Sequence, residues 1–360
     1  MKKQYFGIIA LVAIWAGLTL FAWFGPEKDI SVAERRTLAK MPELTAQSLF
    51  SGRFMDDFEN YTLDQFPMRD SFRSLKALNH RYVLGQQDNN GVYIADGHVA
   101  ELEYPLDEES VGHALKQFNL IYDLYLQDAE NILTTVVPDK GYYLAEKNGY
   151  PVMDHDALFS MVQDGMPWAK YVDITGSLKL TDYYYTDTHW KQECLEPVAK
   201  LLADELNVSI EDTYQVTALE RPFYGVYYGQ AALPMEPDTL NILQSDVLSG
   251  CRVYNYTTGT YTDVYDMTRL ESEDLYEVYL SGAQSLLRIE NPNAVTDREL
   301  IVFRDSYGSS LVPLLVKDYA AVTLIDVRYI LPQMMGRYVD FGNQDVLFMY
   351  SSLVLNKNLI

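Results

Sequence analysis

The chain has 360 residues, enough for one large domain or two of ordinary size. A composition of 48% apolar and 22% charged residues is that of a globular protein, which excludes a disordered tail or a fibrous repeat. Acidic residues outnumber basic ones by 51 to 28, and a net charge of −23 repels phosphate backbones, so no nucleic-acid partner is expected. Cys194 and Cys251 are too few for a disulfide framework, and whether they pair with each other is left open.

The N-terminal segment predicts a membrane helix. Residues 5–24 form an uncharged apolar run of about 20 residues, which is long enough to cross a hydrocarbon core of about 30 Å. Lys2 and Lys3 precede this run, and bulky side chains stand where a signal peptidase requires small ones. We therefore expect residues 1–25 to be an uncleaved signal-anchor at the cell membrane, with the remaining chain outside the cytoplasm. A cleaved signal peptide is the alternative.

The next hundred residues are predicted to be mostly helical. Mixed charges and prolines over residues 26–50 indicate a tether. Apolar residues at helical spacing predict a helix over 48–81, which Pro67 breaks into two pieces. Residues 91–99 predict a hairpin, and residues 110–127 predict an amphipathic helix.

Beyond residue 130 the pattern changes to short apolar strands that alternate with helices. Strands are expected at 131–138, 171–174, 299–303, 320–325 and 345–350, with a helix at 192–206. Such alternation predicts a parallel sheet covered on both faces, with functional residues at the carboxyl ends of its strands. Residues 211–298 interrupt the alternation, are acidic and rich in tyrosine, and are expected to form an inserted β-rich cap.

Two motifs in this region have the residue types of a nucleophilic site. Asp187 and His189 lie two apart on a predicted loop, so the carboxylate can fix the tautomer of the imidazole. Ser306 follows an apolar strand and precedes Gly308 and an apolar helix, a turn that exposes its hydroxyl and directs backbone N–H groups at an oxyanion. The residues alone leave two other interpretations open: a chance surface pair, and a serine that only caps the helix.

Other polar residues carry weaker signals. Arg328 and Tyr329 follow a strand and could complete an oxyanion site, although Asp326 and Arg328 could instead pair with each other. The segments 154–156 and 187–189 contain histidine and aspartate but lack any recognised metal spacing, so no metal is expected. The 29 tyrosines are attributed to packing in preference to sugar-binding platforms.

Several ordered blocks together resemble one family. The blocks are Glu34-Arg35-Arg36-Thr37-Leu38, Asp64-Gln65-Phe66-Pro67-Met68-Arg69, Val137-Pro138-Asp139-Lys140, Tyr185-Thr186-Asp187-Thr188-His189-Trp190, Asp305-Ser306-Tyr307-Gly308-Ser309-Ser310 and Asp326-Val327-Arg328-Tyr329. In this order they resemble the DHHW family of bacterial surface proteins. That family is similar to the SGNH-hydrolase-like domains of the alginate O-acetyltransferases. The motif that gives the family its name has threonine, Thr188, at its second position here.

The resemblance implies an α/β fold and a domain division. The fold would be the SGNH-hydrolase-like three-layer fold with a parallel central sheet, and the serine block would come last, as in a circular permutation. Residues 51–360 would form the catalytic domain, with an insertion at 211–298. The asparagine that the family's third block implies is missing after residues 345–350.

The resemblance also implies roles for individual residues. Ser306, His189 and Asp187 would form a catalytic triad. The oxyanion donors would be the Ser306 backbone N–H with Tyr329 or Arg328. Residues proposed to contact substrate are Trp190, Tyr307 and Tyr185.

The function implied is that of a membrane-anchored extracytoplasmic O-acetyltransferase that acts through an acetyl-serine intermediate. A membrane-bound O-acyltransferase would supply the acetyl group, a cell-surface polysaccharide would accept it, and no cofactor is expected. Two alternatives remain. One is a carbohydrate acetyl-esterase on the same triad, and the other is a non-catalytic glycan-binding scaffold of a polysaccharide synthesis complex.

Overall fold

The structure is a computed structural model that describes residues 2–31 and 33–360. The chain forms two compact units. Unit 1 comprises the described residues up to Asn90 together with 228–235, and unit 2 comprises 91–227 and 236–360.

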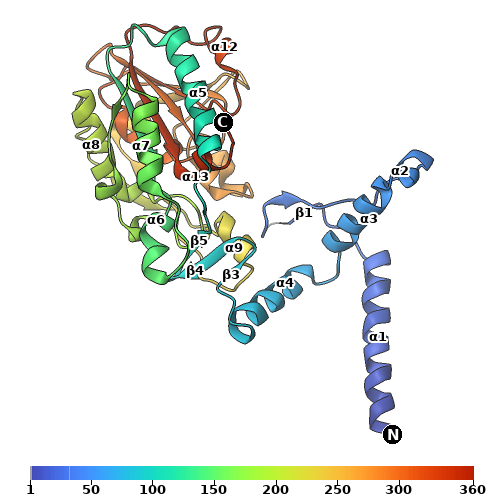
Figure 1. The fold of residues 1–360 in the computed structure, drawn as a ribbon. Coiled ribbons are helices and arrows are strands. Elements are labelled where there is room, and N and C mark those ends of the chain that lie inside the picture. The colour runs from blue at the N-terminus through green and yellow to red at the C-terminus, as the bar shows by residue number, and fades with distance from the viewer. Residues whose placement is uncertain (1, 32) are drawn as a thin grey trace. The chain divides into compact units, whose positions relative to one another are not determined.

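Unit 1 begins with α1 (Lys2–Phe24), which runs straight from the N-terminus (Figure 1). Its stretch Tyr5–Phe24 has a mean hydropathy of 2.1, and none of it is buried. The helix is thus long and apolar enough to cross a membrane, a property that a signal sequence shares. The other elements are β1 (Ile30–Ser31), β2 (Arg36–Thr37), α2 (Ala46–Phe50), α3 (Arg53–Asp64), α4 (Arg69–Leu78), a π-helical turn (Asn79–Val83) and β3 (Asp88–Asn89). The predicted break at Pro67 is confirmed, because α3 ends before it and α4 begins after it.

Polar side chains tie the end of α3 to the segment that follows α1. The Gln65 Nε2 donates to the carbonyl oxygens of Lys28 and Ala39 at 2.9 Å each. The Arg36 guanidinium binds both carboxylate oxygens of Asp64, at 2.8 and 2.5 Å. These bonds hold the end of α3 against the segment that begins a few residues after α1.

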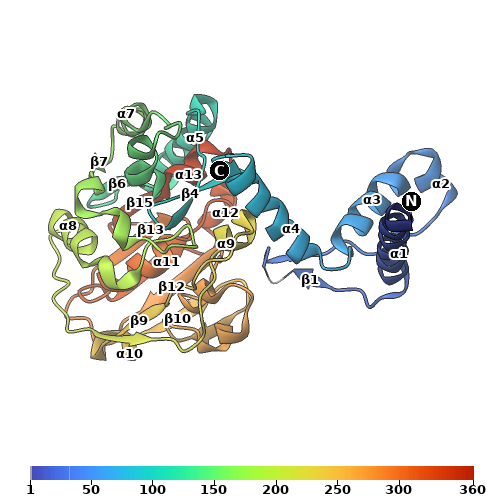
Figure 2. The same cartoon turned by 90° about the horizontal axis from the view of Figure 1, so that it is seen from below.

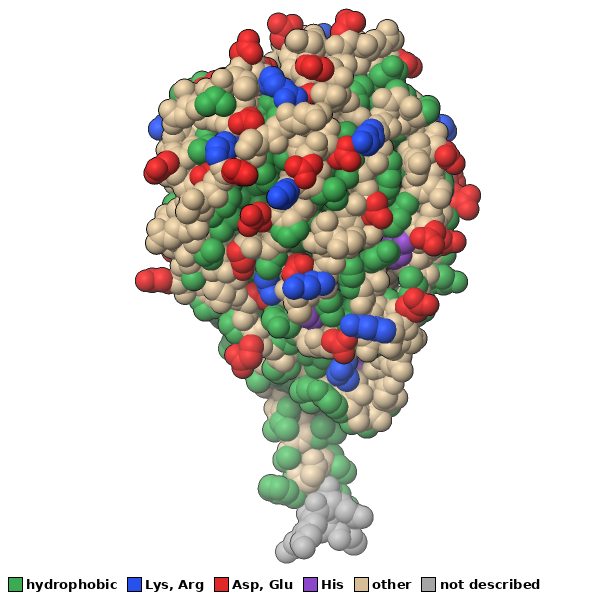
Figure 3. Space-filling model, turned by 90° about the vertical axis from the view of Figure 1, so that its left-hand side faces the viewer, with side chains coloured by type: hydrophobic (Ala, Val, Ile, Leu, Met, Phe, Trp, Pro, Cys, Tyr) green, Lys and Arg blue, Asp and Glu red, His purple; other side chains and the backbone are tan. Residues whose placement is uncertain are grey.

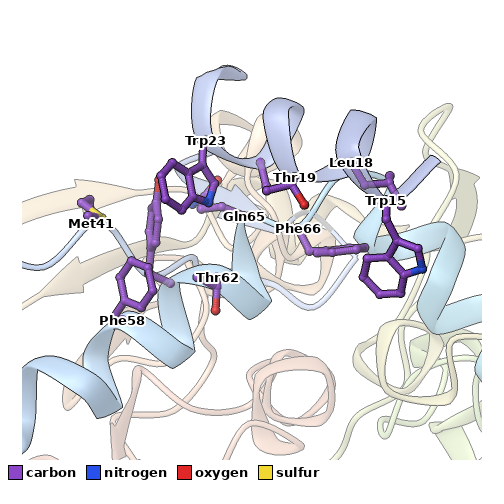
Figure 4. A pocket seen from close by; sticks show the side chains of 11 residues that line it. Trp15, Leu18, Thr19, Trp23, Met41, Phe58, Thr62, Gln65 and Phe66 are labelled. Carbon is purple, nitrogen blue, oxygen red and sulfur yellow. The ribbon is translucent and has the colours of Figure 1, made fainter. Parts of the chain in front are cut away.

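An apolar pocket of about 420 Å³ lies between α1 and α3 (Figure 4). Trp15, Leu18 and Trp23 line it from α1, and Phe58 and Phe66 line it from the other side. Tryptophan and other aromatic side chains of this kind are enriched where membranes meet water.

Unit 2 is built on a sheet of eight strands in the order β11-β10-β12-β14-β13-β15-β6-β7 (Figure 2). Strands β7, β6, β15, β13 and β14 are parallel, and β12, β10 and β11 continue the sheet by antiparallel pairing. The strands are β6 (Ile132–Val137), β7 (Lys170–Tyr171), β10 (Arg252–Asn255), β11 (Thr260–Thr262), β12 (Leu286–Glu290), β13 (Glu299–Arg304), β14 (Ala321–Ile325) and β15 (Asp345–Ser351). The strands predicted at 131–138, 299–303, 320–325 and 345–350 are present, and the sheet is mostly parallel. The strand predicted at 171–174 is shorter and lies earlier, as β7 over Lys170–Tyr171.

Helices cover both faces of this sheet and complete three layers. Along β15, Leu347 and Met349 join the core under α8, whereas Phe348 and Tyr350 join the core under α5 and α7. Successive side chains of a strand point to opposite faces, so a strand buried on both sides is apolar throughout. The helices of unit 2 are α5 (Glu108–Tyr125), α6 (Gly141–Leu144), α7 (His155–Gly165), α8 (Glu196–Leu206), α10 (Asp246–Gly250), α11 (Gly308–Leu311), α12 (Pro332–Met335) and α13 (Ser352–Asn356); α9 (Val226–Ala231) spans the boundary between the units.

The segment 211–298 contributes to the fold in two ways. Strands β8 (Gln215–Ala218) and β9 (Asn241–Gln244) form a separate two-stranded sheet. Strands β10 to β12 extend the central sheet instead, and β10 and β11 form an antiparallel ribbon that turns near Gly259. The predicted hairpin is also present, as β4 (Val92–Ala95) and β5 (His98–Glu101).

On the face shown in Figure 3, acidic side chains are scattered among basic ones instead of forming one patch.

Candidate active site

Ser306 lies at the carboxyl end of a central strand. It follows β13 and precedes α11, so it occupies the predicted strand-to-helix turn. The carboxylate of Asp305, next to it, accepts hydrogen bonds from the N–H groups of Tyr307 at 3.0 Å and Ser351 at 2.8 Å. The turn is thereby fixed to the end of the neighbouring strand β15, and the Ser306 side chain has one defined location.

Asp187 and His189 lie on a loop that is closed at its base. Tyr183 and Trp190 form an antiparallel bridge, and the Tyr184 N–H donates to the His189 carbonyl at 3.1 Å. The indole N–H of Trp190 also donates to the Ser310 Oγ at 2.9 Å, which connects this loop to the helix after Ser306.

These two segments bring three side chains into one chain of hydrogen bonds. The Nε2 of His189 lies 2.8 Å from the Oγ of Ser306, and its Nδ1 lies 2.6 Å from the Oδ1 of Asp187. Asp187 is fully buried, His189 is nearly so, and Ser306 is half-buried. In this geometry the imidazole can accept the serine proton while the carboxylate stabilises the imidazolium.

Aromatic side chains fix the plane of the imidazole. The ring of Tyr276 stacks on that of His189, with centroids 3.8 Å apart and planes within 8°. The hydroxyl of Tyr307 donates to the Thr188 carbonyl at 2.8 Å. Burial raises the pKa of both tyrosines, so each keeps its hydroxyl proton.

Two buried side chains, Lys140 and Asp238, hold the backbone of the same loop. The ammonium group of Lys140 donates to the carbonyl oxygens of Tyr184, Tyr185 and Asp187, at 2.9, 3.2 and 2.7 Å. The carboxylate of Asp238 accepts from the N–H groups of Tyr185 and Thr186, both at 2.8 Å. Together, Lys140 and Asp238 satisfy carbonyl and N–H groups that the irregular loop cannot pair within itself.

A glycine permits a further close approach to this loop. A Cβ at position 225 would lie 2.2 Å from the Cα of Asp187, so no larger residue fits without movement of the backbone. The next N–H, that of Val226, donates to the Oδ2 of Asp187 at 2.9 Å. This bond satisfies the carboxylate oxygen that does not contact the imidazole.

The predicted oxyanion donors lie in other environments. Arg328 donates from Nε and Nη2 to Asp326, at 2.9 and 2.6 Å. This is the pairing predicted from the sequence as the alternative to an oxyanion role. Tyr329 is 56% exposed, and its ring lies under the Arg328 guanidinium. The side chain of Arg328 is therefore engaged elsewhere, and Tyr329 faces solvent.

The three residues predicted to contact substrate differ in how exposed they are. Trp190 and Tyr307 are almost wholly buried, and their rings pack edge to face with centroids 5.2 Å apart. They therefore offer no surface to a substrate and serve to hold the surrounding residues in place. Tyr185 is 44% exposed and packs against His98.

Some residues at the site carried no functional signal in the sequence. Lys140 stood in a family-like block without a role, and nothing in the sequence marked Asp238, Gly225 or Tyr276. Arg304 looked like an ordinary flanking charge, but it is fully buried, and its Nε and Nη2 have no hydrogen-bond partner among the described residues.

Cys194 and Cys251 are free thiols. Within residues 2–31 and 33–360, no group of three or more histidine, cysteine or acidic side chains could hold a metal ion.

Lys140 should make the stability of the chain depend on pH. Burial lowers its pKa to about 7, against the attraction of Asp187 and Asp238. The unfolded lysine keeps its proton to a pH of about 10.4, so between these values the unfolded chain binds more protons and the free energy of unfolding rises with pH. The difference in that free energy between the wild type and Lys140→Met should therefore increase from pH 7 to pH 10.

The measurement is urea unfolding of the full chain at several pH values. Lys147→Met, at an exposed lysine, is the matched control and should show no such trend. A difference between the wild type and Lys140→Met that stays constant with pH would contradict the assignment.

Comparison with solved structures gives several similar proteins. A DHHW family protein from Eubacterium siraeum aligns with a TM-score of 0.61 and 23% identity, over 76% of this chain and 94% of that one. Bacillus cereus PatB1, solved with a sulfonyl adduct, aligns with a TM-score of 0.58 and 15% identity, over 74% of this chain and 97% of that one. No protein-family model matches the chain, and comparison with curated proteins gives no match. The chain thus has the fold of a DHHW family protein and of PatB1, and the resemblance predicted from its sequence is confirmed at the level of the fold.

Proposed function

We propose that the chain is a membrane-anchored O-acetyltransferase that modifies a cell-surface polysaccharide outside the cytoplasm. The observation that carries this proposal is the hydrogen-bonded series of Ser306, His189 and Asp187. The shared fold and the sequence blocks that resemble the DHHW family support it.

In the first step Ser306 would take the acetyl group. His189 Nε2 accepts the proton as the Ser306 Oγ attacks the acetyl carbonyl carbon, and Asp187 stabilises the imidazolium. His189 then returns this proton to the oxygen of the donor, the bond between that oxygen and the carbonyl carbon breaks, and acetyl-Ser306 remains.

In the second step a sugar would replace the donor. A sugar hydroxyl gives its proton to His189 and attacks the acetyl carbonyl, and the ester bond to Ser306 breaks as the proton passes to its Oγ. The product is an O-acetylated sugar and free Ser306. If water took the place of the sugar, the same residues would act as an esterase.

The acetyl donor would be a membrane-bound O-acyltransferase. Because α1 is long enough to span a membrane, it would keep this chain beside such a partner and raise their effective concentration. The tie between α3 and the segment after α1 would hold unit 1 at the membrane surface.

The proposal is tested with p-nitrophenyl acetate as acetyl donor. We expect intact-mass measurement of the full chain to show one added acetyl group, and Ser306→Ala to abolish it. Ser309→Ala, at a buried serine on the same turn, should still acquire the group. An adduct that persists in Ser306→Ala would refute the proposed nucleophile.

The membrane anchor is tested separately. The protein isolated from its native membrane should retain residues 1–25 by intact mass and should require detergent for extraction. A mature chain that begins near Gly25 and washes from membranes in salt would instead identify a cleaved signal peptide.

A further inference from the structure

A cleft of about 300 Å³ lies at the carboxyl edge of the parallel strands, the edge that also carries Ser306. Its lining includes three tyrosines, Tyr256, Tyr329 and Tyr338, and two hydroxyl residues, Thr257 and Ser285. Neither the triad nor the proposed mechanism uses any of these side chains.

Strand pairing places this cleft next to Ser306. Phe303 of β13 is opposite Ile325 of β14, and Ile325 is opposite Leu286 of β12. The N–H of Tyr256 donates to the Leu286 carbonyl at 3.2 Å. Phe303, Ile325, Leu286 and Tyr256 thus form a row of four residues that runs across the strands. Neighbouring strands are about 4.8 Å apart, so the row covers about 14 Å between β13, which Ser306 follows, and Tyr256. The cleft and the nucleophile therefore lie along the same carboxyl edge of the sheet, separated by about three strand spacings.

The tyrosine rings are available to a ligand. Tyr329 is 56% exposed and Tyr338 is 50% exposed, although large aromatic rings are usually buried. Tyr256 meets Tyr338 edge to face, with centroids 6.3 Å apart and planes at 80°, so the two rings form a corner. Rings in this arrangement present flat apolar faces with polar hydroxyls at their tips.

Polar groups of the cleft are neutral. The hydroxyls of Thr257 and Ser285 lie 3.0 Å apart and can both donate and accept hydrogen bonds. Among the described residues, no acidic or basic side chain lines the cleft, and the neighbouring Arg328 is already bound to Asp326. A neutral, hydroxyl-rich ligand with apolar C–H faces matches this lining better than an anionic one does.

We propose that this cleft is an acceptor subsite, in which Tyr256, Tyr329 and Tyr338 hold neutral pyranose rings of a glycan whose nearby hydroxyl reaches Ser306. The proposal rests on the proposed function and names the class of its acceptor. It gives Tyr329 a role in substrate binding in place of the oxyanion role predicted from the sequence.

The test is a binding measurement that does not depend on catalysis. Calorimetry with the full chain, in a detergent without a sugar headgroup, uses cellotetraose and tetra-N-acetylchitotetraose as neutral probes and tetragalacturonate as an anionic one. We expect at least one neutral probe to bind, and Tyr329→Ala and Tyr338→Ala each to weaken it about tenfold, because each removes one ring face. The matched control is Tyr261→Ala, at a tyrosine of β11 that is 50% exposed and outside the cleft, and it should bind as the wild type does.

The same titration with Ser306→Ala separates this proposal from the proposed function. Binding to Ser306→Ala, together with a wild type that forms no acetyl adduct, would refute the catalytic proposal and support the subsite. Failure of both neutral probes, tighter binding of tetragalacturonate, or equal loss in Tyr261→Ala would overturn the subsite.

Discussion

The hydrogen bond between the Ser306 hydroxyl and the His189 imidazole joins segments that are 117 residues apart in sequence. Everything else at the site serves to keep these two groups 2.8 Å apart. Parallel strands fix where β13 ends, and Asp305 fixes the turn that follows. The bond from Trp190 to Ser310 then connects the histidine loop to the helix after the serine. For the proposed acetyl transfer, a displacement of about 1 Å in either segment would lower the rate about 100-fold, so the proposed mechanism requires these contacts.

The second requirement is a loop that stays irregular without losing its backbone hydrogen bonds. Lys140 and Asp238 meet it from two sides, because the amino group of Lys140 donates to carbonyl oxygens and the carboxylate of Asp238 accepts from N–H groups. Removing either side chain would leave buried backbone groups without a hydrogen-bond partner, at a cost of about 1–3 kcal/mol for each group. These bonds also hold the backbone of Asp187 in place.

The sheet could be predicted because strands buried on both faces are mostly apolar, as in residues 346–350. Residue types and spacing marked Ser306, Asp187 and His189 as candidates, and the resemblance to the DHHW family joined them into a triad. Asp238 and Gly225 could not be predicted, because their roles depend on which distant backbone they meet in the folded chain. Tyr329 was noticed for its place after a strand, but its exposure is set by packing that no local pattern encodes. The antiparallel extension of the sheet by β10 to β12 was also not predicted. Strands that pair across a long stretch of sequence show no pattern in the sequence that identifies their partners.

The most direct test of the account is covalent capture of the nucleophile by phenylmethylsulfonyl fluoride, followed by peptide mapping. A serine is sulfonylated readily only when a neighbouring base accepts its proton. The account predicts one adduct, on Ser306, and a rate of labelling that falls by two orders of magnitude or more in Asp187→Asn, because the imidazole then loses its fixed tautomer. Asp263→Asn, at an exposed aspartate, should be labelled like the wild type. An adduct on a different residue, or equal labelling of Asp187→Asn, would contradict the account.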